Sequence, residues 1–167
     1  MGQYHAPINL ERMEYLEPLA FDDGRKLTEF AMSGVGTMTA LAALLSTSNG
    51  RGYGDLHPGL PGAEEWCREN DTTGEWMLRH VLGRWANNRI AIVGDYWQQE
   101  DLPDWGDGEP GGPWAMPGDW INVSRLGLVA IGLDPEHRDF ARSRIAFSDD
   151  NADWGDAPPV TLPGVPA

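Results

Sequence analysis

The chain has 167 residues, of which 41% are hydrophobic and eight are tryptophan, and this length and composition predict one globular domain rather than a disordered chain. Its net charge is −14 at pH 7, and basic residues are scattered singly apart from Arg25-Lys26, which excludes ordinary nucleic-acid binding. No apolar run approaches about 18 residues, which excludes a membrane span, and the first residues lack the pattern of a secretion signal.

An N-terminal hairpin is predicted from residues 3–9 and 13–17, where apolar residues suit two short strands around a turn. Because Pro7 lacks a backbone N–H, we expect the first strand at an edge of the sheet. Residues 25–46 predict an amphipathic helix, since apolar residues recur there at steps of three and four. Two glycines within residues 33–37 predict a kink in that helix or the close approach of another backbone.

The middle of the chain predicts a short helix at 63–69 and a second helix, begun by the capping residues 71–73 and ended by 87–88. Three apolar residues share one side of the second helix: Met77, Val81 and Trp85. Residues 89–97 form the strongest predicted strand. Its continuous apolar run indicates that both of its faces are covered.

Beyond a Gly- and Pro-rich loop at 98–119, a short strand is predicted at 120–123 and a helix from Ser124 through Leu133. Asp134-Pro135 predicts the start of a further helix that runs to about Arg142, by the rule that proline favours the first helical turn. Residues 144–147 predict a final strand.

These elements together predict an α+β fold. We expect a single domain at residues 1–148, in which a small mixed or antiparallel sheet with the N-terminal hairpin packs against two or three helices. Residues 149–167 predict an acidic, Pro-rich tail. The lone cysteine, Cys67, excludes an internal disulfide and indicates a reducing, cytoplasmic compartment, and its thiol is interpreted as buried or idle.

The loop at residues 49–62 is the first candidate site, because its glycines let backbone amides face a ligand and Arg51 can pair with a phosphate or carboxylate. Asp55 and His57 would point to one side of an extended chain, a spacing that suits a divalent metal ion. With the end of the strong strand, the candidate ligand-binding residues are Asn49, Arg51, Asp55, His57, Asp95 and Tyr96. The alternative is a structural loop in which Asp55 and His57 bind backbone groups. The sequence predicts no cofactor, although a divalent metal ion would suit this site.

The acidity is uneven, since residues 1–90 carry a net charge of −4 and residues 91–167 carry −10. It is interpreted either as a means of solubility or as an acidic face that docks on a basic partner. The string Asp-Trp-Gly-Asp occurs twice, and a tryptophan amid acids is a plausible anchor for a protein contact. The candidate partner-binding residues are Asp104, Trp105, Asp107, Asp153, Trp154 and Asp156. No catalytic set such as Ser-His-Asp can be named, which favours a non-enzymatic protein.

Several motifs in the first 97 residues together resemble one family of small uncharacterised proteins from actinobacteria, other bacteria and bacteriophages. They are MGQY at the start, DGxKLxEF, SGxGT, NGRGxGDLH at 49–57 and WAxxRIxIxGDY at 85–96. The resemblance implies a bacterial or phage cytosolic protein and carries no activity. We therefore expect a small acidic cytoplasmic binding module that engages a protein, a host protein if it is phage-encoded. The alternative is a nucleotide or metal-dependent small-molecule site on residues 49–57 and Asp95.

Overall fold

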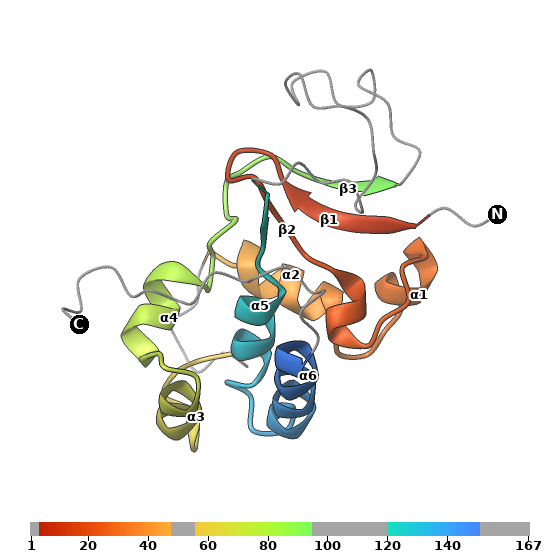
Figure 1. Ribbon diagram of the computed structural model, residues 1–167. Coiled ribbons are helices and arrows are strands. Elements are labelled where there is room, and N and C mark those ends of the chain that lie inside the picture. Colours follow the sequence, from red (N-terminus) through yellow and green to blue (C-terminus); the bar gives the residue numbers. More distant parts are fainter. Residues whose placement is uncertain (1–3, 48–55, 95–119, 151–167) are drawn as a thin grey trace.

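A computed structural model of the chain describes residues 4–47, 56–94 and 120–150, without the side chains of residues 147–150. Within these ranges a four-stranded mixed sheet covers one side of a group of six α-helices (Figure 1). The predicted α+β class is confirmed, and the sheet is mixed because one of its three strand pairs is parallel.

The sheet consists of β1 (His5–Asn9), β2 (Glu14–Tyr15), β3 (Ile90–Gly94) and β4 (Ile121–Asn122), in the order β3-β1-β2-β4. β1 runs antiparallel to both β2 and β3, and β2 runs parallel to β4. The predicted N-terminal hairpin and the short strand near residue 121 are therefore confirmed. The strong strand is confirmed as far as Gly94, the last residue described there.

Pro7 lies inside the sheet, so its predicted place at an edge is wrong. The carbonyl of Pro7 accepts a hydrogen bond from Leu16 N at 3.0 Å, but proline has no N–H with which to complete that pair. This missing donor accounts for the end of β2 at Tyr15. The other side of β1 pairs with β3 and needs no N–H from Pro7, which is why an interior strand tolerates it.

β3 occupies an edge of the sheet, and only one of its faces is covered. Val93 joins a buried cluster with Ile8 on that face, with Ala91 and Tyr15 packed against it. On the opposite face Ile90 is 37% exposed and Ile92 is 41% exposed. The prediction that both faces are covered is therefore wrong, because a run of apolar residues does not say which strands flank it.

The single helix predicted at 25–46 is two helices, α1 (Leu27–Ala31) and α2 (Thr37–Leu45). They are separated at the two glycines, so the chain breaks there instead of bending within one helix. Asp23 supplies the cap that starts α2, since its Oδ2 accepts from Thr37 N at 2.7 Å and from Thr37 Oγ1 at 2.6 Å. A Cβ at Gly36 would lie 2.8 Å from the Asp23 Cγ, so glycine gives the carboxylate room to reach the helix end.

The next two helices are α3 (Ala63–Glu69), which matches its predicted bounds, and α4 (Gly74–His80). Thr73 caps α4 as predicted, because its Oγ1 accepts from Trp76 N at 3.1 Å. α4 ends well before residues 87–88, where its end was predicted. Gly83, at φ +79°, turns the chain, and a Cβ there would lie 2.5 Å from the Ser46 carbonyl oxygen.

The segment after α4 completes the C-terminal end of α2. Gly83 N donates to Ala43 O at 2.9 Å and Trp85 N donates to Leu44 O at 2.8 Å. These two carbonyls would otherwise lack partners, because the last turn of a helix has no further N–H groups. Trp85 is fully buried as a result and joins the main core.

The C-terminal helices are α5 (Ser124–Ile131), which confirms the predicted helix, and α6 (Arg138–Asp150). Residues 134–137 form turns, so α6 begins later than predicted. The strand predicted at 144–147 is wrong, because these residues continue α6. Ala141 and Ile145, one turn apart, are both buried there.

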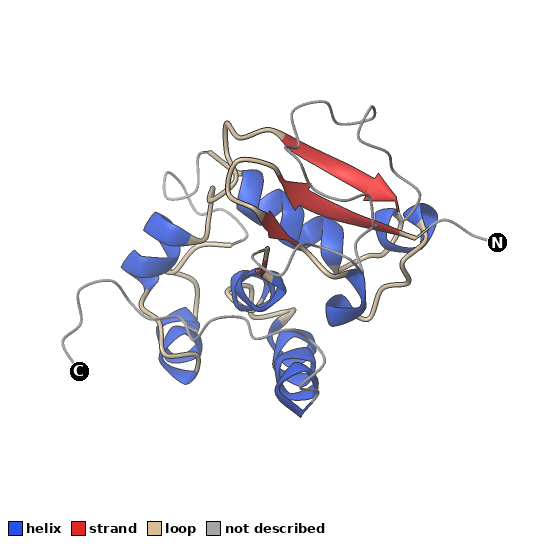
Figure 2. Ribbon diagram, turned by 45° about the horizontal axis from the view of Figure 1, so that its top comes forward, coloured by secondary structure: helices blue, strands red, loops and turns tan. Residues whose placement is uncertain are grey.

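The main core lies among the helices, around α5, which has other helices on several sides (Figure 2), and the smaller cluster of Ile8 and Val93 lies on the sheet. α2 and α6 both pack on α5, and a short 3₁₀ helix at Pro18–Phe21 packs on it as well. A Cβ at Gly127 would lie 2.7 Å from the Ala40 Cβ, so glycine permits the close approach of α5 to α2. None of the helices in the described ranges combines the length and apolar character that crossing a bilayer requires.

α6 ends at Asp150, slightly past the predicted domain boundary at residue 148. The remainder of the predicted tail, 151–167, lies outside the described residues. The division into a domain and a tail stays a prediction.

Candidate functional site

His57 is the one predicted ligand-binding residue that the described ranges include. Its Nδ1 accepts a hydrogen bond from Gly59 N at 2.9 Å, and its carbonyl accepts from Leu60 N at 3.0 Å. An imidazole whose Nδ1 accepts a hydrogen bond carries its proton on Nε2 when it is neutral. His57 therefore shapes a turn, which was the structural alternative for this loop.

The other predicted site residues lie outside the described residues, and their roles stay predictions. They are the ligand candidates Asn49, Arg51, Asp55, Asp95 and Tyr96, and the partner candidates Asp104, Trp105, Asp107, Asp153, Trp154 and Asp156. In the part of the chain that the structure describes, no group of three or more His, Cys, Asp or Glu residues is placed to hold a metal ion.

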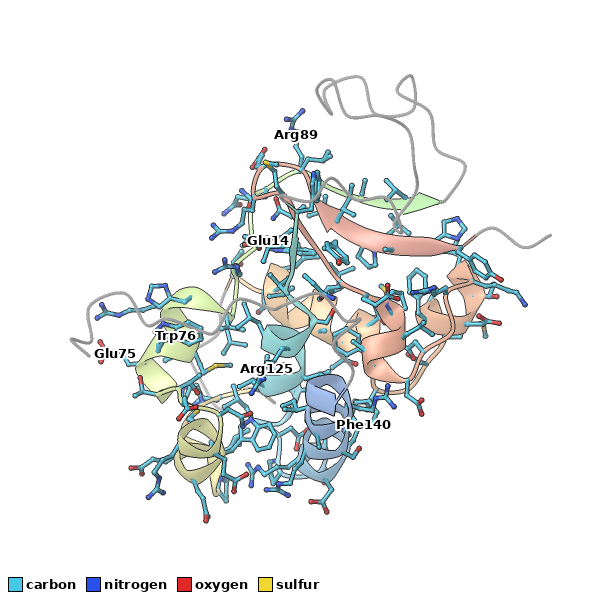
Figure 3. The ribbon with its side chains drawn as sticks, in the orientation of Figure 1. Glu14, Glu75, Trp76, Arg89, Arg125 and Phe140 are labelled. Carbon is cyan, nitrogen blue, oxygen red and sulfur yellow. The ribbon has the colours of Figure 1, made fainter. Side chains whose placement is uncertain are left out.

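A buried carboxylate that the sequence interpretation missed joins the hairpin to the helices. Glu14 on β2 is 2% exposed and accepts from Arg84 Nε at 3.0 and 2.9 Å, from Arg84 Nη2 at 2.5 Å and from Trp85 Nε1 at 2.7 Å. Arg12 Nε adds a longer contact of 3.4 Å from the hairpin turn. Figure 3 shows Glu14 between the sheet and the helices.

The same hairpin carries a second, more exposed polar group. Asn9 Oδ1 accepts from Glu11 N and Arg12 N at 3.0 Å each, which shapes the hairpin turn, and Asn9 Nδ2 donates to Asn88 Oδ1 at 3.0 Å. Glu11 accepts from Asn88 Nδ2 at 2.6 Å and from Arg89 Nε at 3.3 Å. Arg89 points away from the body of the molecule (Figure 3).

We call these two groups the hairpin cluster: Asn9, Glu11, Arg12, Glu14, Arg84, Trp85, Asn88 and Arg89. Every carboxylate in it meets donors from residues 84–89. A buried carboxylate held by a guanidinium and an indole N–H has no lone pair in position to accept a proton from a substrate. The cluster therefore fastens the hairpin to the helices. The Trp85–Arg89 stretch belongs to one of the motifs on which the family resemblance rests.

A second buried network joins β2, β4 and α5. Glu17 accepts from Arg25 Nε at 3.0 Å and Nη2 at 3.1 Å, and its backbone N donates to Ser124 Oγ at 2.8 Å. Ser124 Oγ in turn donates to Asn122 Oδ1 at 2.6 Å, and Asn122 also bonds Tyr15. Burial, followed by the neighbouring Glu17 charge, raises the pKa of Tyr15 above its ordinary value of 10.0.

Tyr15 is expected to make the protein sensitive to alkali. Because the folded pKa is the higher one, its contribution to stability is complete below pH 10.0 and is lost as the pH rises through the folded value. The free energy of unfolding should fall with pH in that window, and it should fall less steeply for Tyr15→Phe. Urea unfolding at several pH values between about 8 and about 11 measures the slope of the unfolding free energy against pH for both proteins. Equal slopes would contradict the assignment to Tyr15.

Cys67 is buried in the main core, which confirms its interpretation as a buried thiol. Burial raises the pKa of this thiol above its ordinary value, which keeps it protonated and unreactive near neutral pH. Its backbone carbonyl accepts from Thr72 Oγ1 at 3.1 Å and so helps to end α3.

The three buried carboxylates of the described ranges, Glu14, Glu17 and Asp23, are thus all engaged in structural hydrogen bonds. The candidate functional surface is instead the rim of the sheet. Gly94 ends β3 at one edge, and Trp120 leads into β4 at the other edge. Three strand spacings separate these edges, about 14 Å.

Both residues of the rim, Gly94 and Trp120, are fixed by contacts with the sheet. Gly94 pairs with His5 across the β1–β3 ladder, and Trp120 packs against the cluster of Ile8 and Val93. These two residues flank residues 95–119 in the sequence. Comparisons with protein-family models, curated proteins and solved structures found no match to this chain, so the case for its function rests on its own residues.

Proposed function

We propose that this chain is a small acidic binding module that docks on a basic protein, a host protein if the chain is phage-encoded, and that it is not an enzyme. The observation that carries the proposal is the placement of Gly94 and Trp120, the described residues that flank residues 95–119 in the sequence: Gly94 pairs with His5 in the sheet, and Trp120 packs against Ile8 and Val93. Binding segments are commonly loops that a rigid scaffold holds in place. The saturated carboxylates of the scaffold support a structural role for the rest of the described chain.

The charge of the sequence supports a basic partner. Residues 95–119 contain seven acids and no base, and residues 151–167 contain two acids and no base. These two stretches account for −9 of the net charge of −14. In the described ranges, by contrast, several acids are already paired with arginines, as in Glu14–Arg84 and Glu17–Arg25. Excess negative charge attracts and orients a positively charged surface, and salt screens this attraction.

The small-molecule alternative gains no support from the residues described. Its one described member is His57, whose Nδ1 accepts a hydrogen bond from Gly59 N. The remaining members lie outside the described ranges, so that site stays a prediction.

The proposal is tested by neutralising acids of residues 95–119 and measuring the affinity for a defined basic peptide of alternating Lys and Val. Replacing Asp104 and Asp107 by Asn should weaken binding about fivefold at low salt, and the difference should shrink as salt is added. The matched control replaces Glu64 and Glu65 by Gln on the exposed side of α3, which removes the same charge elsewhere. Isothermal calorimetry at several salt concentrations gives the affinities.

Equal losses from the two double variants would mean that only the total charge matters, and the proposal would then fail. It would fail equally if the wild-type chain did not bind the peptide at low salt. Circular dichroism of both variants shows that the fold is retained, which is expected because all four substitutions conserve side-chain size.

A further inference from the structure

The outer edge of β3 carries backbone groups that no other described residue pairs with. The register pairs Asn9 with Ile90 and Pro7 with Ile92, and Leu10 N donates to Arg89 O at 3.0 Å. In an antiparallel ladder, hydrogen-bonded and non-hydrogen-bonded pairs alternate. Since Arg89 bonds β1, Ala91 and Val93 do so too, and Ile90 and Ile92 direct their N–H and C=O groups away from the sheet.

Nothing in the described ranges pairs with these outward groups. β3 is the last strand on its side of the sheet, and the backbone hydrogen bonds of the described residues include none to Ile90 or Ile92 on that side. Both side chains are also exposed, at 37% and 41%, and they lie on the same face because they are two residues apart on a strand. An edge strand of this kind is a template for a further strand.

The charge of the chain indicates which kind of strand would pair there. A second copy carries −14 as well, so two copies repel each other. An extended segment of a basic protein is attracted instead, and in the sequence the acidic residues 95–119 follow directly after Gly94, the last residue of β3. A strand with an apolar residue at every second position would cover Ile90 and Ile92, and basic residues between them would point to the other face.

We infer that the outer edge of β3 binds an extended segment of the basic partner as a fifth strand of the sheet, through the backbone groups of Ile90 and Ile92. This inference rests on the proposed function and adds the place and the manner of docking. The partner's backbone supplies the affinity, and its alternating apolar and basic side chains supply the selectivity.

The sharpest test leaves the protein unchanged and alters the backbone of the probe. The probe is a peptide of about eight residues with alternating Val and Lys, long enough to cover one strand. One version carries N-methyl groups on its Val residues and the other carries them on its Lys residues, so the two have equal charge and composition. A Val residue opposite Ile92 must donate its own N–H to the edge. N-methylation of Val should therefore weaken binding about tenfold or more, while N-methylation of Lys should change it less than about threefold.

A pair of protein variants examines the same edge from the other side. Ile92→Pro removes an outward N–H and leaves the ladder with β1 intact, whereas Ile92→Thr loses the apolar side chain but keeps that N–H. The proline variant should lose about tenfold in affinity and the threonine variant less than about threefold. Thermal unfolding checks that both variants fold.

Two results would overturn the inference. In the first, the two N-methylated peptides bind equally and Ile92→Pro does not change the affinity, while neutralising Asp104 and Asp107 still weakens binding. The proposed acidic module would then be retained, and the edge of β3 would be wrong as its docking site. If sedimentation shows a dimer of the wild-type chain that Ile92→Pro abolishes, and the peptides show no selectivity, the edge is an interface between copies of this chain.

Discussion

Glu14→Ala is expected to lower the free energy of unfolding by about 3 kcal/mol, because it leaves a half-buried guanidinium and a buried indole N–H without their shared acceptor. Glu14 is 2% exposed, and both Arg84 and Trp85 Nε1 bond its carboxylate. The Arg84 side chain is 20% exposed, so water can take over part of its hydrogen bonding. This exposure places the expected loss at the lower end of the range for a broken buried ion pair.

The same hairpin offers a matched control for Glu14. Glu11 also binds an arginine and a side-chain N–H, from Arg89 and Asn88, but it is 40% exposed. Glu11→Ala should therefore cost less than about 1 kcal/mol. Urea unfolding followed by tryptophan fluorescence measures both variants. Similar losses for the two would show that burial of Glu14 does not govern its contribution.

Gly132→Ala is expected to destabilise the protein by about 3 kcal/mol through overpacking. A Cβ at this position would lie 2.8 Å from Trp66 Nε1 and closer still to two ring carbons. Trp66 cannot easily move aside, because it is fully buried and its Nε1 donates to Val129 O at 2.8 Å. The backbone of Gly132 is ordinary for any residue, at φ −71° and ψ −5°, so the cost is steric and not conformational.

A control and a rescue make this prediction specific. Gly34 has no atom within 4 Å of where its Cβ would stand, so Gly34→Ala should change the stability by less than about 1 kcal/mol. Trp66→Phe removes the ring atoms that would meet the new methyl group. The double variant should therefore lose less stability than the two single variants lose in total, by about 1 kcal/mol or more. Additive losses would show that the strain lies elsewhere.

The elements that were predicted correctly depend on neighbours in the sequence. The bounds of α3 and the capping of α4 by Thr73 follow from contacts within a few residues, which a pattern of residue types can express. The hairpin is of the same kind, since Asn9 Oδ1 holds the turn through backbone N–H groups two and three residues on.

The elements that were predicted wrongly depend on neighbours in space. The short apolar run at 144–147 suits a strand or a helix equally well, and its place beside α5 decides for the helix. Pro7 suits an interior strand because β2 ends beside it, and Ile90 and Ile92 are exposed at a strand that has no further neighbour within the described ranges.

The candidate site divides in the same way. The excess of acids in residues 95–119 can be counted in the sequence, and so can the Asp-Trp-Gly-Asp strings. The ion pair between Glu14 and Arg84, which are 70 positions apart, could not be predicted from the sequence, because ion pairs between distant segments leave no local pattern. His57 is a candidate metal ligand by its spacing from Asp55; in the structure its Nδ1 accepts from Gly59 N within a turn, and its role as a ligand stays a prediction.

The α+β class, the capping of α4 by Thr73 and the concentration of negative charge beyond residue 90 could be predicted from the sequence, since each depends on composition or on residues close in the chain. The arrangement of the described residues in space shows which buried carboxylates have all their hydrogen-bond partners and which strand edge is unpaired in those ranges. Those properties depend on which distant segments meet, and the order β3-β1-β2-β4 leaves Ile90 and Ile92 without a neighbouring strand among the described residues.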